Sequence, residues 1–101
     1  MSRKRVVVTG MGMLSPVGNT MNDTWSSLIA AKSGVANITH FDTEGFGTHF
    51  SASVKDFDLS NYLPPKEGKK MDLFIQYGMA AGIQAIKDAN LEVTDENADR
   101  I

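Results

Sequence analysis

Three lysines gather directly after a pair of prolines, in the stretch Pro64-Pro65-Lys66-Glu67-Gly68-Lys69-Lys70. Lys66, Lys69 and Lys70 outweigh Glu67 here, although the whole chain carries a net charge of −2. Ammonium groups on an acidic chain attract an acidic partner, raising the encounter rate and fixing orientation more than adding affinity. The cluster is therefore a candidate docking site for an acidic partner. Charge and spacing alone favour the alternative, a helix start whose charges are merely solvated.

The chemistry open to these 101 residues is limited by their composition. They contain no cysteine, which excludes a thiolate nucleophile, a disulfide framework and a thiolate zinc site. The two histidines, His40 and His49, are interpreted as polar loop or surface residues. We therefore assign no catalytic, cofactor-binding or metal-binding residue to this chain. A hydrophobic fraction of 42% with 22% charged residues is typical of a globular protein, and nothing predicts nucleic acid as a partner.

The glycine-rich segment 10–18 has two interpretations. Gly10-x-Gly12 after an apolar run matches the first half of a dinucleotide-binding fingerprint. The third glycine position holds Ser15, however, Pro16 follows where a helix should begin, and no acidic residue ends a second strand at the expected distance. A dinucleotide-binding domain is thus the disfavoured alternative. We expect the glycines to form a tight turn that lets the preceding strand return beneath a sheet.

Hydrophobic periodicity predicts the elements that must position these residues. The β-branched run 5–9 predicts a buried strand, and residues 51–54 a short one. Asn22-Asp23 can cap a helix that reaches about Ala31, with Lys32 and Gly34 as stop signals. The longest element is a helix that starts at Glu67 or Lys69 and ends at Ala89, with Asn90 as the terminating residue.

The long helix is apolar on nearly all sides, which is typical of a core helix in a large protein. Gly78 and Gly82, four residues apart, should let another backbone approach closely. A domain of this length cannot easily surround such a helix. We therefore expect no complete independent domain in residues 1–101 and expect the chain to fold against further polypeptide. The aromatic residues are assigned to core and dimer packing: Trp25, Phe41, Phe46, Phe50, Phe57 and Phe74.

The amino terminus predicts a cytoplasmic protein. The basic and apolar residues 3–8 soon meet Gly10 and Pro16, so no signal-peptide core forms. No segment offers the run of about 18 apolar residues that a membrane span requires.

An ordered succession of motifs along the whole chain resembles the β-ketoacyl-acyl carrier protein synthases, a family of thiolase-like condensing enzymes. Within the family the amino-acid sequence is most similar to the elongating synthase II group. The motifs are the opening segment 6–19, Trp25, Ser33-Gly34, Phe41-Asp42, the segment Val54-Lys55-Asp56-Phe57 and the segment 69–78.

The resemblance implies an α/β, layered αβαβα fold, of which residues 1–101 are the amino-terminal part of the first half, and a homodimer. It implies decarboxylative condensation of malonyl-carrier protein with an acyl thioester, by a cysteine and two histidines that lie beyond this chain. No metal or diffusible cofactor is implied, because phosphopantetheine arrives on the acyl carrier protein.

Lys66, Lys69 and Lys70 match the positions where the family binds the acidic carrier helix. Lysine at position 69, where arginine is frequent, keeps the charge but loses the bidentate fork. A non-catalytic carrier-binding fragment remains the alternative.

Overall fold

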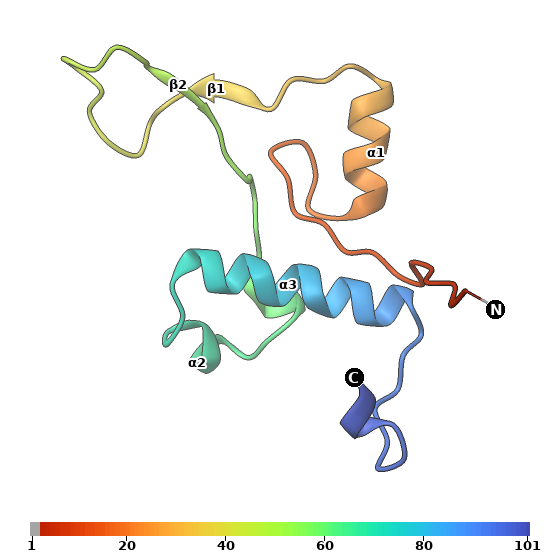
Figure 1. Cartoon of the computed structure of the whole chain (residues 1–101). Helices are drawn as coiled ribbons and strands as arrows, with labels where there is room; N and C mark the ends of the chain where they lie inside the picture. The colour runs from red at the N-terminus through yellow and green to blue at the C-terminus, as the bar shows by residue number, and fades with distance from the viewer. Residues whose placement is uncertain (1–2) are drawn as a thin grey trace.

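The computed structural model describes residues 3–101. Its helices and strands are α1 (Met21–Ile29), β1 (Val35–Asn37), β2 (Phe50–Ala52), the 3-10 turn η1 (Leu59–Asn61), α2 (Pro65–Gly68), α3 (Leu73–Asp88) and the 3-10 turn η2 (Ala98–Arg100). β1 and β2 pair antiparallel, with Val35 opposite Ala52 and Asn37 opposite Phe50. Figure 1 shows this hairpin standing away from α3, with α1 on the same side of α3. The expected short strand near residues 51–54 is confirmed as β2.

The predicted long helix is divided into two. Asp72 has an extended backbone (φ −65°, ψ 160°), so the helical turn that contains α2 ends before α3 begins. The carboxyl end of α3 agrees with the sequence. Asn90 adopts a left-handed φ of 53°, and the amide of Leu91 donates to the carbonyl of Ile86 at 3.2 Å. This pattern satisfies the last carbonyls of a helix, and asparagine tolerates the left-handed conformation that it requires.

α1 forms where expected, but different residues begin and end it. The Thr20 side chain caps the helix by accepting from the amide of Asp23 at 3.0 Å, so the expected Asn22-Asp23 cap is wrong by two residues. At the other end Ala31, not Gly34, takes the left-handed conformation, with φ 57°. The amide of Lys32 then donates to the carbonyl of Ser27 at 2.9 Å, which closes the helix.

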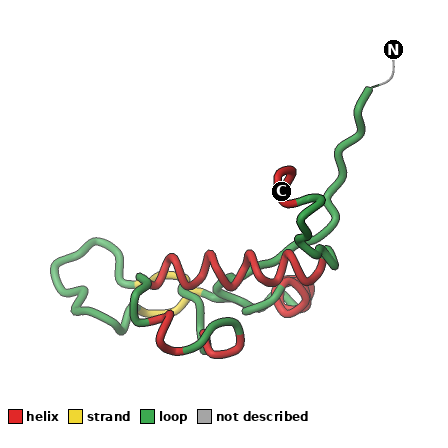
Figure 2. Tube along the Cα trace, turned by 90° about the horizontal axis from the view of Figure 1, so that it is seen from below, coloured by secondary structure: helices red, strands yellow, loops and turns green. Residues whose placement is uncertain are grey.

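The predicted strand 5–9 does not form within residues 3–101. Val6, Val7 and Val8 are 94%, 67% and 79% exposed, and no backbone hydrogen bond joins residues 5–9 to the rest of the described chain. Figure 2 shows the segment running away from the helices. A strand exists only through hydrogen bonds to a neighbouring strand. The paired strands of the described residues, β1 and β2, lie elsewhere.

The segment that follows lies directly on α3. A Cβ atom on Gly10 would be 2.5 Å from the carbonyl oxygen of Ala85, and one on Gly12 would overlap the carbonyl oxygen of Ala81. Neither glycine has a left-handed φ; among the described glycines that belongs to Gly45. The tight turn expected in segment 10–18 is present at Ser15–Gly18, where the two residues exchange backbone hydrogen bonds of 2.8 and 3.3 Å, but it does not involve Gly10 or Gly12. The two glycines allow an extended chain to approach a helix backbone.

Two side chains of α3 hold this segment by its amides. Met11 donates to the Asp88 carboxylate at 2.9 Å, and Met13 donates to the Gln84 Oε1 atom at 3.0 Å. Gln84 and Asp88 are about 6 Å apart along the helix, one turn of four residues. Amides two residues apart on an extended chain are spaced about 6.6 Å. The two repeats match, so the helix offers acceptors in register with the segment.

The part of α3 around Gly78 and Gly82 has no close backbone neighbour among residues 3–101. A Cβ atom on Gly78 or Gly82 would meet nothing within 4 Å, so the close approach expected there is absent from the described chain. The neighbouring apolar side chains are exposed: Phe74 by 72%, Ile75 by 40% and Ile86 by 49%. Within residues 3–101 the close backbone contact is instead made further along the helix, between residues 10–13 and Ala81 and Ala85.

The described residues expose more surface than a closed domain of this size. The accessible surface is 8479 Å² and the radius of gyration is 17.9 Å. A compact 11.0-kDa monomer would expose about 5,600 Å² and have a radius of gyration of about 13 Å. Among residues 3–101, Ala80 is the fully buried hydrophobic residue.

The expected packing of the aromatic residues is borne out by one of them. Phe57 is half-buried, with its ring edge-to-face with Tyr77 at 5.0 Å and stacked on Tyr62 at 6.3 Å. Edge-to-face and stacked pairs both favour association beyond the area that they bury. The other aromatic side chains of that prediction are exposed within the described chain: Trp25, Phe41, Phe46, Phe50 and Phe74.

Candidate functional site

The three lysines lie together on a helical turn that precedes α3, at the lower left of Figure 1. The turn includes α2 and continues through Met71, because the amide of Lys70 donates to Glu67 and that of Met71 donates to Gly68. Residues three and four apart on a helical turn share a face. Lys66, Lys69 and Lys70 therefore form one basic face, and all three side chains are exposed.

Local sequence explains why the chain turns here. Pro64 has φ −60° and ψ 146°, and Pro65 occupies the first helical position. Proline is favoured there because its ring fixes a helical φ and its missing amide would have had no partner. The residue before a proline is held extended, so the direction of the chain changes at this point.

The inner side of the turn packs against η1. Gly68 is buried, and a Cβ atom on it would overlap the Leu59 side chain. Because Gly68 faces inward, the basic face of the same turn points outward. The role of this glycine is close packing rather than an unusual backbone angle.

Gln76, on the first turns of α3, connects that helix to the turn. Its Nε2 atom donates to the carbonyls of Gly68 and Met71, each at 3.2 Å. The two acceptors flank Lys69 and Lys70 in the sequence. Gln76 is half-buried, so its hydrogen bonds are partly shielded from water.

Asp58 is the N-cap residue of η1, the element that packs against the helical turn. The Ser60 hydroxyl donates to the Asp58 Oδ1 atom at 2.6 Å, and the Ser60 amide donates to it at 3.0 Å. These two hydrogen bonds, the hydroxyl first, hold the pKa of the Asp58 carboxyl below its ordinary value. A lowered folded-state pKa means that the capping contribution is present above the unfolded pKa and is lost as the pH falls through the folded one.

The substitution Ser60→Ala should raise the pKa of Asp58 toward its ordinary value, because the dominant hydrogen bond to the ionised form is lost. An NMR pH titration of the Asp58 carboxyl carbon measures the change. Ser51→Ala is the matched control, since Ser51 lies on β2, away from this cap. A pKa that is the same with and without Ser60 would show that the hydroxyl does not hold the ionised carboxylate.

The basic face presents free positive charge. Among residues 3–101, none of the three ammonium groups donates a hydrogen bond or forms an ion pair with a neighbouring carboxylate, and Glu67 is exposed on the same turn. Solvated ammonium groups on one face attract an anionic surface without first having to break internal pairs. The arrangement is chemically suited to an acidic partner.

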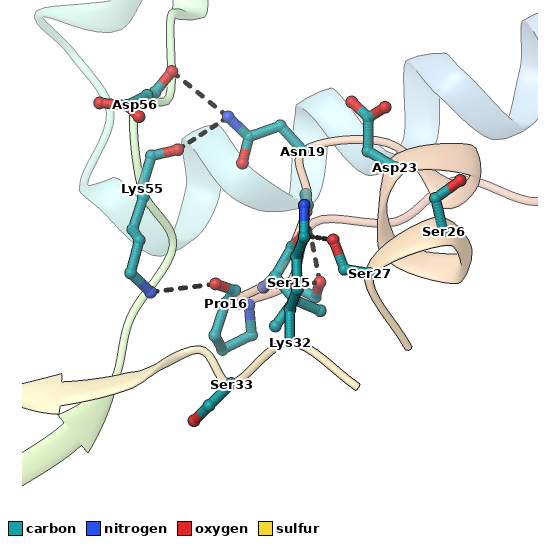
Figure 3. A pocket seen from close by; sticks show the side chains of 12 residues that line it. Ser15, Pro16, Asn19, Asp23, Ser26, Ser27, Lys32, Ser33, Lys55 and Asp56 are labelled. Atoms are coloured by element: carbon teal, nitrogen blue, oxygen red, sulfur yellow. Dashed lines mark hydrogen bonds between the residues drawn. The ribbon is translucent and has the colours of Figure 1, made fainter. Parts of the chain in front are cut away.

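A second polar region is the cleft of about 530 Å³ between α1 and the glycine-rich loop (Figure 3). The Lys55 ammonium group donates there to the carbonyls of Pro16, Gly34 and Ser53, at 3.0, 2.8 and 3.0 Å. All three of its protons are thus used to connect the loop with the hairpin. Lys55 stood in a family motif, but nothing in the sequence indicated this structural role.

Gln84 also joins distant segments of the chain, a role that the sequence did not predict. Besides accepting from Met13, it donates through Nε2 to the carbonyl of Asn19 at 2.7 Å and to the Tyr62 hydroxyl at 2.9 Å. Asn19 in turn donates to the carbonyl of Lys55 at 2.8 Å. The sequence does mark Gln76 and Gln84 as candidates for buried hydrogen bonds, because both are polar residues in an otherwise apolar helix.

The histidines lie in the loop between β1 and β2, both exposed, as expected for surface residues. The His49 ring nitrogen Nδ1 is 2.9 Å from the Thr43 hydroxyl, and the His40 ring lies edge-on to Phe41. Within residues 3–101 no group of His, Asp and Glu side chains is arranged to hold a metal ion. No described helix is long and apolar enough to cross a bilayer.

The dinucleotide interpretation of segment 10–18 finds no support in the geometry. α1 begins at Met21 with its cap at Thr20, so no helix starts at Ser15, where the fingerprint requires one. The amides of Met11 and Met13, which would face a phosphate, already donate to α3.

Comparison with known proteins agrees with the motifs along the chain. The family model of the β-ketoacyl synthase N-terminal domain matches residues 3–101. The 3-oxoacyl-[acyl-carrier-protein] synthase 2 of Vibrio cholerae is 61% identical over all 101 residues, and that of Coxiella burnetii is 45% identical over the same length. The chain spans 24% of the length of each of these relatives.

The fold comparison gives the same class. A solved structure described as the ishigamide ketosynthase/chain length factor superposes with a TM-score of 0.76 and 37% identity. The match covers 90% of this chain and 23% of that one. The α/β architecture is therefore that of one part of a ketosynthase, and the chain belongs to the β-ketoacyl synthase family.

Proposed function

We propose that these residues are the amino-terminal part of a carrier-protein-dependent condensing acyltransferase that elongates fatty acyl chains. The observation that carries the proposal is the match of the β-ketoacyl synthase N-terminal domain to residues 3–101, together with 61% identity to a 3-oxoacyl-[acyl-carrier-protein] synthase 2. Lys66, Lys69 and Lys70 would bind the acidic acyl carrier protein that delivers both substrates.

The proposed reaction has two stages. A cysteine thiolate outside these residues accepts the acyl group and releases the first carrier thiol. Malonyl-carrier protein then loses carbon dioxide with the help of two histidines, and the resulting carbanion attacks the acyl thioester. A carbon–carbon bond forms, the carbon–sulfur bond to the cysteine breaks, and a 3-oxoacyl carrier protein leaves. Residues 1–101 alone would be inactive, because they contain no cysteine.

The proposal also covers the fold, oligomeric state, location and cofactors of the complete protein. The complete protein would have a layered, thiolase-like αβαβα fold, form a homodimer and work in the cytoplasm. It would need no metal or diffusible cofactor, because phosphopantetheine arrives on the carrier protein. The exposed valines 6–8 and the exposed Gly78 side of α3 support the view that residues 1–101 are no independent domain. Both would be covered by further parts of the same layers.

A condensation assay tests the function. The intact protein that carries this segment is mixed with acyl-carrier protein and malonyl-carrier protein, and carbon dioxide and 3-oxoacyl product are measured. We expect both in equal amounts, and we expect neither from residues 1–101 alone. An intact protein that binds carrier protein but releases no carbon dioxide would instead favour the alternative, a non-catalytic carrier-binding fragment.

A further inference from the structure

Lys69 and Lys70 lie on the chain between two carbonyl groups that are held by the same side chain. The Gln76 Nε2 atom donates to the carbonyl of Gly68 on one side of the pair and to that of Met71 on the other, each at 3.2 Å. Gln76 projects from α3, the longest helix of the described chain, whereas Gly68 ends the four-residue α2. A short helical turn is therefore fastened to a long helix across the lysine pair.

Little else fixes this turn to α3. Its own hydrogen bonds are local, from Lys70 to Glu67 and from Met71 to Gly68, and both are 3.2 Å long. On the inner side, Gly68 contacts Leu59 of η1 rather than α3. An isolated four-residue helix is too short to be stable in water. The two hydrogen bonds of Gln76 thus set the direction in which the lysines point relative to the rest of the molecule.

We propose that Gln76 is a positioning residue for docking of the acidic carrier protein, which it does not itself touch. This inference rests on the proposed docking role of the three lysines and adds a residue that orients them. A surface whose backbone is already ordered binds its partner with a smaller entropic loss. With Gln76 in place, the backbone that carries Lys69 and Lys70 is held against α3 before the partner arrives.

The test uses the intact synthase with the substitution Gln76→Met, which keeps side-chain length but removes both donors. We expect KM for malonyl-carrier protein to rise roughly fivefold, with kcat unchanged. Activity on a small malonyl thioester without carrier protein should stay the same. Hydrogen exchange at the amides of Lys70 and Met71 should become faster. If the variant folds poorly, Gln76→Glu, which also lacks the donors, serves in its place.

Gln84→Met is the matched control. It removes hydrogen bonds of the same kind from the same helix, but these hold Asn19 and Tyr62 rather than the turn. We expect it to lower thermal stability and to leave KM for the carrier-borne substrate unchanged. The inference is overturned if KM for malonyl-carrier protein rises equally in both variants. It is also overturned if Gln76→Met loses as much activity on the small malonyl thioester as on malonyl-carrier protein, because Gln76 would then only stabilise the fold.

Charge reversal at the three lysines separates this inference from the function on which it rests. If reversal leaves KM for malonyl-carrier protein unchanged, the docking site itself is refuted. If reversal raises KM and Gln76→Met changes it less than twofold, the docking site stands and only the positioning role is overturned.

Discussion

Replacing Lys66, Lys69 and Lys70 together by glutamate should raise KM for malonyl-carrier protein roughly 10- to 100-fold in the intact synthase. The three ammonium groups share one exposed face and form no internal ion pairs within residues 3–101. Reversal therefore turns attraction for an acidic partner into repulsion without breaking contacts of the fold. Steady-state kinetics at several salt concentrations measure the effect. The wild-type KM should rise with salt, because salt screens attraction between exposed charges, and that dependence should flatten or invert in the variant.

The control for this experiment reverses the same number of charges elsewhere. Arg3, Lys4 and Lys32 are exposed and lie outside the basic face. Replacing these three by glutamate changes net charge equally and should alter KM for the carrier-borne substrate by less than about threefold, because these charges do not belong to the basic face and salt screens exposed charges that are not in contact with the partner. Equal effects of the two triple variants would mean that overall charge, and not this face, governs carrier binding.

Gly12→Ala should destabilise the intact protein by at least about 3 kcal/mol, at the upper end of what overpacking usually costs. The added Cβ atom would overlap the backbone carbonyl of Ala81 and lie 2.7 Å from the Gln84 Cβ atom. A helix backbone cannot yield as a flexible side chain can, so the segment must lift from α3. The hydrogen bonds from Met11 and Met13 to Asp88 and Gln84 would then be lost. The midpoint of thermal unfolding should fall by several degrees.

Gly47→Ala is the matched control for Gly12→Ala. A Cβ atom on Gly47 meets nothing within 4 Å, and its φ is not in the left-handed region. Alanine there should be neutral or slightly stabilising, because it reduces the freedom of the unfolded chain. If Gly12→Ala were as stable as Gly47→Ala, the close approach of residues 10–13 to α3 would not exist in the intact protein.

The basic face could be recognised from sequence, but its support could not. Lys66, Lys69 and Lys70 stand close together after two prolines, and charge and spacing are local properties. The break at Asp72, which separates α2 from α3, is also short in range, yet apolar periodicity concealed it. Gln76 was visible as a polar interruption of a helix. Its acceptors are carbonyl oxygens, however, which every residue carries, so their identity depends on how the chain turns.

The amino-acid sequence was sufficient for the family, for a long apolar helix and for its end at Asn90, because motif order, periodicity and capping act over a few residues. Folding of the chain assigned the roles of Gly10, Gly12 and Gln84, whose contacts join residues about 70 positions apart. Within residues 3–101 residues 5–9 have no pairing strand, although their composition favours a strand. Pairing requires a neighbouring strand at hydrogen-bonding distance, and a segment's own residues do not specify where that neighbour lies.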